Sequence, residues 1–216
     1  MKSVLSKIFS NSFILIIITA IIKLPLLFTK NIQEDSFITW RVARNLVNYG
    51  VIGFNGDERI SASTTHLYVL ITAFFQLVFG EYFIVPLIVF SGILFAVGSL
   101  WLAKILFPDD ILKRGFFVVL LNMLPPALTA SALGMEYGIL FFLYNALIYF
   151  GVFKGKNWAY LILPILLLWT RIDTVIFLGV FFWADLIIKR KINVLFIVGG
   201  ILGVVSVVYF NYLYFG

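Results

Sequence analysis

The run SFILIIITAIIKLPLLF, residues 12–28, carries a single charged side chain, Lys23, and is long enough to cross a bilayer as a helix. Comparable apolar runs occupy residues 82–103, 115–133, 137–153, 158–170, 174–188 and 194–215. Two of them, 158–170 and 174–188, are short for a crossing. The sequence therefore predicts an all-α, polytopic membrane protein, a single membrane domain over 1–216 with about seven transmembrane helices.

The composition excludes several classes of protein. Of 216 residues, 62% are hydrophobic and 12% charged, whereas about a quarter of a soluble domain is charged. The net charge of +6 comes from small basic clusters between apolar runs, so it indicates membrane topology and no nucleic-acid partner. The chain has no cysteine and one histidine. A disulfide framework is therefore excluded, and a histidine-based metal site is not expected.

The N-terminus has the basic start of a signal sequence, with Lys2 and Lys7 before the first apolar run. A cleaved signal peptide begins in the same way, but no convincing small-residue cleavage site follows here. We therefore expect an uncleaved signal anchor with a cytoplasmic N-terminus.

Residues 67–79 decide the topology, because this apolar segment is shorter than the others and contains Gln76. A segment of that length is more often interfacial or re-entrant than spanning. If it does not cross, most lysines and arginines lie in the cytoplasm and residues 30–66 form an external loop. An external N-terminus with 67–79 crossing gives a stronger charge bias. That arrangement needs a very short crossing and puts Lys2 and Lys7 on the unfavourable side.

The loop 30–66 is the one stretch long enough to hold chemistry outside the bilayer. Within it, residues 35–49 predict an amphipathic helix on the membrane surface, with Asp35 as N-cap and Gly50 as the stop. At 100° per residue its polar stripe comprises Arg41, Arg44, Asn45 and Asn48, and its apolar stripe Ile38, Val42, Leu46 and Tyr49. A turn at 55–58 then leads into the segment 67–79.

Several ionisable side chains share the external side in this topology. They are Glu34 and Asp35 before the helix, Arg41 and Arg44 on it, His66 after it, Glu136 at a tip between two apolar runs, and Arg171 and Asp173 in a break between two others. Each has a structural alternative: a helix cap, a lipid headgroup contact, an ion pair at a helix break, or a polar anchor. Together they fit an anion clamp beside a carboxylate base, at the depth of a lipid phosphate.

The loop also resembles a known family. EDSFITWRVARNL (34–46), Gly53-Phe54-Asn55, Glu58-Arg59 and the stretch from Ser63 to Tyr68 are similar to the first external loop of GT-C glycosyltransferases, in the arabinofuranosyltransferase- and mannosyltransferase-like branch. Gly134-Met135-Glu136 resembles the family's Gly-Met-Glu turn. Thr170-Arg171-Ile172-Asp173 resembles its Arg-Pro-Asp/Glu-Gly break, with Ile172 and Thr174 replacing Pro and Gly.

Two departures from the family pattern matter. The family's acidic pair is commonly Asp-Asp, whereas here it is Glu34-Asp35, so the pattern leaves open which carboxylate acts. Family members also continue with further membrane helices and often an external domain, whereas this sequence stops after its last predicted helix. This difference predicts a truncated or split product.

The resemblance implies an enzyme of the bacterial inner membrane. It would move a sugar from a polyprenyl-phosphate carrier to a hydroxyl of an envelope glycan, lipid or protein on the periplasmic face. It assigns Asp35 or Glu34 as the base, Arg171, Arg41 and Arg44 to the donor phosphate, and Glu136, His66 and Asp173 to sugar or acceptor. Some relatives use a divalent cation, and nothing in this sequence demands one. The alternative is a non-catalytic lipid-carrier binding or translocation subunit, or an inactive remnant.

Overall fold

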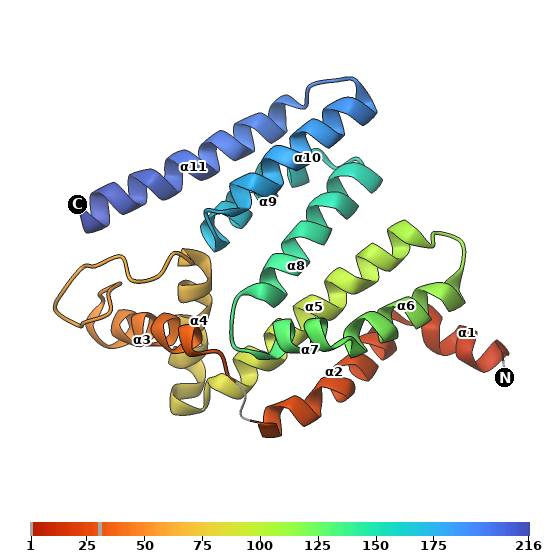
Figure 1. Cartoon of the computed structure of the whole chain (residues 1–216), viewed down its shortest axis with the longest axis horizontal. Helices are drawn as coiled ribbons and strands as arrows, with labels where there is room; N and C mark the ends of the chain where they lie inside the picture. The colour runs from red at the N-terminus through yellow and green to blue at the C-terminus, as the bar shows by residue number, and fades with distance from the viewer. Residues whose placement is uncertain (1, 30–31) are drawn as a thin grey trace. The chain divides into compact units, whose positions relative to one another are not determined.

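The computed structural model describes residues 2–29 and 32–216, so Lys30 and Asn31, where the predicted external loop begins, lie outside the described residues. The described residues form helices and connecting loops without a strand, which confirms the all-α prediction (Figure 1). The chain divides into two compact units, one comprising residues 1–36 and 84–145 and the other residues 37–83 and 146–216.

The first unit is built from the N-terminal helices and the middle of the chain. Its helices are α1 (Lys2–Ser10), α2 (Ser12–Thr29), the first turn of α3 (Glu34–Tyr49), α5 (Ile84–Leu106), α6 (Ile111–Met123), α7 (Pro125–Ala132) and most of α8 (Tyr137–Ala146). Leu15, Leu100, Ala103 and Val118 form a buried apolar cluster between α2, α5 and α6.

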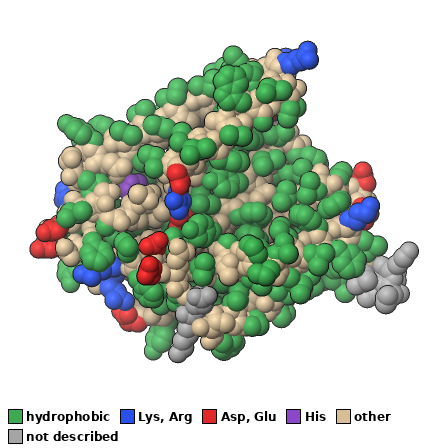
Figure 2. All heavy atoms as spheres, viewed as in Figure 1, with side chains coloured by type: hydrophobic (Ala, Val, Ile, Leu, Met, Phe, Trp, Pro, Cys, Tyr) green, Lys and Arg blue, Asp and Glu red, His purple; other side chains and the backbone are tan. Residues whose placement is uncertain are grey.

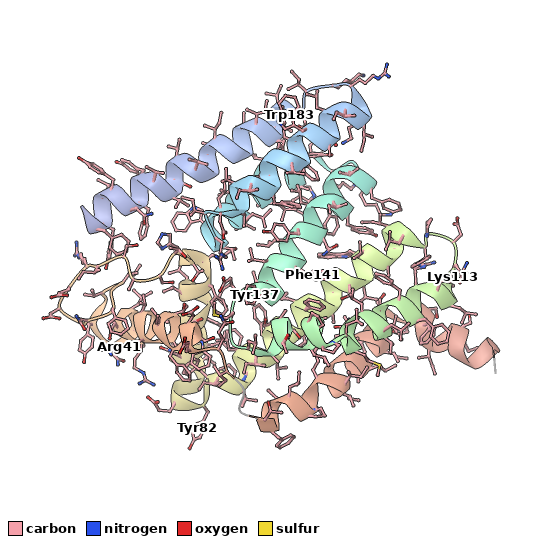
Figure 3. All side chains as sticks on the ribbon, viewed as in Figure 1. Arg41, Tyr82, Lys113, Tyr137, Phe141 and Trp183 are labelled. Carbon is pink, nitrogen blue, oxygen red and sulfur yellow. The ribbon has the colours of Figure 1, made fainter. Side chains whose placement is uncertain are left out.

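Aromatic stacking and one polar pair join the helices of this unit. Phe141 of α8 stacks on Phe95 of α5, with ring centroids 4.2 Å apart (Figure 3). Asn122 of α6 donates to the Ser99 hydroxyl of α5 at 3.1 Å and to the carbonyl of Val118 at 2.8 Å. Buried hydrogen bonds of this kind satisfy polar groups where water is excluded.

The second unit comprises the rest of the chain. Its helices are the remainder of α3, α4 (His66–Phe79), the 3₁₀ turn Gly80–Tyr82, the π-helical segment Leu147–Phe153, α9 (Asn157–Thr170), α10 (Thr174–Lys189) and α11 (Val194–Phe215). Val42 and Ala43 of α3 pack against Val69 and Ala73 of α4, so a protein surface covers much of the apolar side of α3.

The most extensive helix contact in this unit joins α9 and α11. The two glycines of the Gly199-x-x-x-Gly203 spacing are buried on α11 and face the α9 backbone. Across the same contact, the Trp169 indole N–H donates to the Ser206 hydroxyl at 2.9 Å. Small residues allow membrane helices to approach closely, because without a bulky side chain their backbones pack directly.

Among the residues that the structure describes, three helices, α2, α5 and α11, are long and apolar enough to cross a membrane, and the chain is a membrane protein on that basis. A fourth span results if α6 and α7 are counted together, although they are bent by 68°. The sequence predicted a membrane segment over 115–133, and the structure divides this segment into two helices at Leu124. The helix ends before Leu124 because Pro125 and Pro126 lack the N–H donors that a continuing helix needs.

The surface of the molecule fits a lipid environment. Hydrophobic side chains cover most of the face shown in Figure 2, and charged side chains occur in a few small groups. Large apolar side chains on α10 and α11 are well exposed, among them Ile176 (71%), Trp183 (62%) and Tyr212 (72%). Exposed apolar surface on this scale is typical of proteins that contact lipid or a partner.

Candidate functional site

The acidic pair Glu34 and Asp35 lies exposed in the first turn of α3. Two hydrogen bonds fix this turn within the first unit. The Gln33 N–H donates to the carbonyl of Leu133 at 3.1 Å, and the Ser36 hydroxyl donates to the same carbonyl at 2.9 Å. The start of α3, which carries the acidic pair, is therefore held against the turn that follows α7, and this turn also carries Glu136.

Glu136 occupies the predicted place between two helices, but its environment was not predicted. Gly134 adopts a φ of +79°, a left-handed conformation that glycine tolerates and that lets the chain reverse between α7 and α8. The Glu136 side chain is 0% exposed, even though it lies in a turn. The buried Glu136 carboxylate does not reach the surface, whereas the exposed carboxylates of Glu34 and Asp35 can contact a ligand directly.

The ends of α3 agree with the sequence in one case and differ in the other. The helix begins at Glu34, so Asp35 lies inside the first turn and not at the N-cap position predicted for it. There its negative charge still faces the positive end of the helix dipole. Gly50 ends the helix as predicted, with a φ of +70° and an N–H that donates to the carbonyl of Leu46.

His66 opens α4 in the second unit and lies in an aromatic cluster. Its ring centroid is 6.0 Å from that of Trp169 and 5.2 Å from that of Phe210, and its ring stacks on Phe215 at 6.4 Å. The side chain is 5% exposed. Burial lowers the pKa of His66 below its ordinary value of 6.5, and the Asn211 side chain opposes this shift. His66 is therefore a neutral, packed imidazole near pH 7.

Arg171 and Asp173 form a local ion pair in the break between α9 and α10. The guanidinium donates to both carboxylate oxygens of Asp173, at 3.1 and 2.8 Å. Their side chains are 30% and 55% exposed, so the pair lies at the surface. Because Trp169 contacts His66 and lies two residues before Arg171, the structure places His66 beside the helix end that leads into this break.

Arg41 and Arg44 also have partners within the second unit. Arg41 donates to the carbonyl of Phe54 at 2.9 Å, and its guanidinium lies 4.1 Å from the centre of the Phe54 ring (Figure 3). Arg44 pairs with Glu81 at 2.8 Å, and the two side chains are 52% and 81% exposed. The first contact folds the loop after α3 back onto the helix, and the second joins α3 to the turn after α4.

Asn45 was predicted on the exposed polar stripe of the helix, and this was wrong. It is 8% exposed and donates to the carbonyls of Gly53 and Phe54 at 2.9 and 2.8 Å. Loop carbonyls that leave water need a donor, and the amide of Asn45 supplies it. The one sequence signal is that the Arg-Asn-Leu segment precedes a loop with three glycines, Gly50, Gly53 and Gly56.

Other residues that position the loop were missed altogether. Tyr214, near the end of α11, accepts a hydrogen bond from the Ile52 N–H at 2.8 Å, and the Arg59 guanidinium lies 4.9 Å from its ring centre. Gln76 of α4 donates to the carbonyl of Trp40 at 2.9 Å. These contacts join segments far apart in sequence, which no local pattern reveals.

The predicted site residues thus form two groups, each within one unit. Glu34, Asp35 and Glu136 belong to the first unit, and Arg41, Arg44, His66, Arg171 and Asp173 to the second. Among the residues that the structure describes, no group of three or more histidine, aspartate or glutamate side chains is placed to hold a metal ion.

No protein-family model, no curated protein and no solved structure matches the chain. The likeness to GT-C glycosyltransferases therefore rests on the residues quoted above.

Proposed function

We propose that the protein is a membrane glycosyltransferase of the GT-C type. It would take a sugar from a polyprenyl-phosphate carrier and transfer it to an acceptor hydroxyl of an envelope glycan, lipid or protein. The observation that carries the proposal is the exposed pair Glu34–Asp35, held by the Leu133 carbonyl next to the turn of Glu136. Exposed carboxylates at a fixed helix start suit general-base work on a hydroxyl.

The reaction is a single displacement. A carboxylate of the pair, Asp35 or Glu34, accepts the proton of the acceptor hydroxyl while the hydroxyl oxygen forms a bond to the anomeric carbon. The bond from that carbon to the carrier's phosphate oxygen breaks, and the phosphate leaves with the electron pair. One base and one leaving group invert the anomeric centre, without the second carboxylate that a retaining route requires. Arg171, Arg41 and Arg44 are the proposed phosphate ligands, and His66 and Asp173 orient the substrates.

The proposal includes a topology. The cytoplasmic membrane of a bacterium holds the chain with its N-terminus inside and the loop 32–66 on the periplasmic face. About seven crossings result if α8 with its π-helical extension, α9 and α10 also cross, tilted or in a locally thinned bilayer. The helix α4 then lies at the interface, because its 14 residues are too few for a full crossing.

The test is sugar transfer by the purified chain in lipid, with labelled polyprenyl-phosphate sugars as donors. Asp35→Asn keeps the size of the side chain but removes the basic oxygen, so turnover at saturating donor should fall by about 10²–10⁴-fold. Asp57→Asn, in the exposed loop, is the matched control and should retain turnover. Full turnover in both Asp35→Asn and Glu34→Gln contradicts the proposal.

A second candidate is a non-catalytic subunit that binds or moves the lipid carrier. The observation that favours it is that Arg171 and Arg44 already pair with Asp173 and Glu81. An arginine that already pairs with a carboxylate stabilises the negative charge on a leaving phosphate less well. Donor binding without transfer by an otherwise folded protein distinguishes this candidate from the transferase.

A further inference from the structure

Lys23 is the one charged residue of α2, and it lies on the face of that helix that points into the first unit. Leu15, Thr19 and Lys23 repeat every four residues and form the buried stripe of α2. Lys23 as a whole residue is only 7% exposed. It therefore does not extend along the surface of the helix to the headgroups, as lysines near helix ends commonly do.

The Lys23 ammonium has no hydrogen-bond acceptor among the described residues. The ammonium lies over the Phe95 ring, whose centroid is 4.5 Å from Nζ. A ring face attracts a cation but does not accept the three hydrogen bonds that an ammonium can donate. An ionisable side chain inside a membrane protein that lacks an ionic partner indicates a functional site.

Lys23 is one of the residues that line a cavity of about 60 Å³. Its lining includes Lys23, Gly92, Ser131 and Ala132, and at its edge the more exposed side chains of α2 and α5. These edge side chains are Leu24 (46% exposed), Val89 (37%) and Ile93 (37%). A water molecule needs roughly 10–15 Å³ of such volume. The cavity therefore has room for a few water-sized groups, such as phosphate oxygens, and lies beside side chains that face the lipid.

The same cavity extends to the residue before Leu133, whose carbonyl anchors the start of α3. Ala132, in its lining, precedes Leu133, whose carbonyl accepts the hydrogen bonds of Gln33 and Ser36. The first unit thus holds exposed acids and, close to their anchor, a buried cation without an acidic partner. The arginines predicted for the donor phosphate all belong to the second unit.

We propose that the cavity beside Lys23 binds the phosphate of a membrane lipid, which reaches it from the bilayer between α2 and α5. This inference takes its ligand, a polyprenyl phosphate, from the proposed function, and it adds Lys23 as the residue that holds the phosphate. The ammonium supplies charge-assisted hydrogen bonds to the phosphate oxygens. The apolar edge of Leu24, Val89 and Ile93 accompanies the start of the lipid chain.

The test is a titration of the purified chain in neutral detergent with polyprenyl phosphate, followed by native mass spectrometry. Lys23→Met has a similar length but no charge, and it should weaken binding by about 10- to 100-fold, as expected for one lost charge-assisted hydrogen bond. Lys23→Arg keeps the charge and should retain most of the affinity. Lys113→Met is the control, because the Lys113 side chain is 68% exposed and pairs with Asp110.

A second variant guards against a Lys23→Met protein that fails to fold. Gly92→Val keeps the lysine and fills the cavity, since a Cβ at Gly92 would meet only the Lys23 side chain, at 3.6 Å. This variant should also weaken binding if the phosphate enters the cavity. If Lys23 served only to pack against Phe95, Gly92→Val would leave binding unchanged. Unchanged affinity in both Lys23→Met and Gly92→Val overturns the inference.

Two further arms separate the possible sources of phosphate. Phosphatidylglycerol that binds with the same dependence on Lys23 supports a general lipid-phosphate site. Inorganic phosphate that binds as tightly as the lipids overturns access from the bilayer. Lys23-dependent lipid binding without any sugar transfer retains this inference and refutes the transferase. Sugar transfer with wild-type donor affinity in Lys23→Met does the reverse.

Discussion

Two adjacent glycines of α11 provide a sharp test of how the second unit is packed. A Cβ added at Gly199 would lie 2.5 Å from the carbonyl oxygen of Leu161 and 2.7 Å from that of Tyr160, both in the α9 backbone. A Cβ added at Gly200 would meet nothing within 4 Å. The same substitution, glycine to alanine, therefore meets a helix backbone at one position and open space at the next.

The comparison isolates the steric effect. Alanine is favoured over glycine inside a helix by about 1 kcal/mol, and this gain applies equally to Gly199→Ala and Gly200→Ala. The clash at Gly199 involves backbone atoms that move only if α9 shifts, and such overpacking costs about 1–3 kcal/mol. The helix preference cancels in the difference, so Gly199→Ala should be about 1–3 kcal/mol less stable than Gly200→Ala.

The assay is equilibrium unfolding in mixed micelles with increasing sodium dodecyl sulfate, followed by circular dichroism. Gly203→Ala should fall between the two variants, because its nearest clash, at 2.6 Å, is with the flexible tip of Leu168, while the Ile165 backbone lies at 3.1 Å. Equal unfolding free energies for Gly199→Ala and Gly200→Ala would refute the close packing of α9 against α11.

Three further predictions concern protonation, topology and a buried polar pair. Burial depresses the pKa of His66 below 6.5, so its contribution to stability is present above about pH 6.5 and is lost as the pH falls toward the depressed value. His66→Phe should therefore reduce the fall in melting temperature between pH 7.5 and pH 5. An unchanged fall would show that other titratable groups cause it. Because the chain has no cysteine, single cysteines at Asp57 and Lys156 report sidedness in intact cells. An impermeant thiol reagent should label position 57 but not 156, and the opposite pattern would invert the topology. Ser99→Ala removes a buried acceptor of Asn122 and should cost about 0.6 kcal/mol of unfolding free energy, the average for such membrane hydrogen bonds, whereas a gain in stability would contradict that contact.

Features encoded by local sequence could be predicted. The last apolar run, residues 194–215, has the bounds of α11, and the break at Arg171-Ile172-Asp173 separates α9 from α10 as expected. Gly50 ends α3 because a left-handed φ favours glycine wherever it occurs. Hydrophobic runs and glycine stops act over a few residues, so they can be identified without tertiary structure.

Features that depend on tertiary contacts could not be predicted. The sequence places Glu136 at the tip between two apolar runs, but it does not show that the side chain is completely buried there. The pairing of Arg44 with Glu81 joins residues 37 positions apart, and helical periodicity does not predict it.

Two further features could have been predicted from the sequence. The kink at Pro125 is one, because two adjacent prolines rarely continue a helix. The Gly199-x-x-x-Gly203 spacing was also readable as a helix-packing signal.

The structure also bears on which member of the acidic pair acts. Ser36 faces the turn after α7, since its hydroxyl donates to the carbonyl of Leu133. At about 100° per residue, Asp35 is rotated by roughly 100° from that direction and Glu34 by roughly 160°. Asp35 therefore lies nearer to the turn that carries Glu136, and Glu34 points away from it. If substrates bind at this turn, Asp35→Asn should reduce turnover more than Glu34→Gln. A larger loss in Glu34→Gln would place the acceptor on the opposite side of α3.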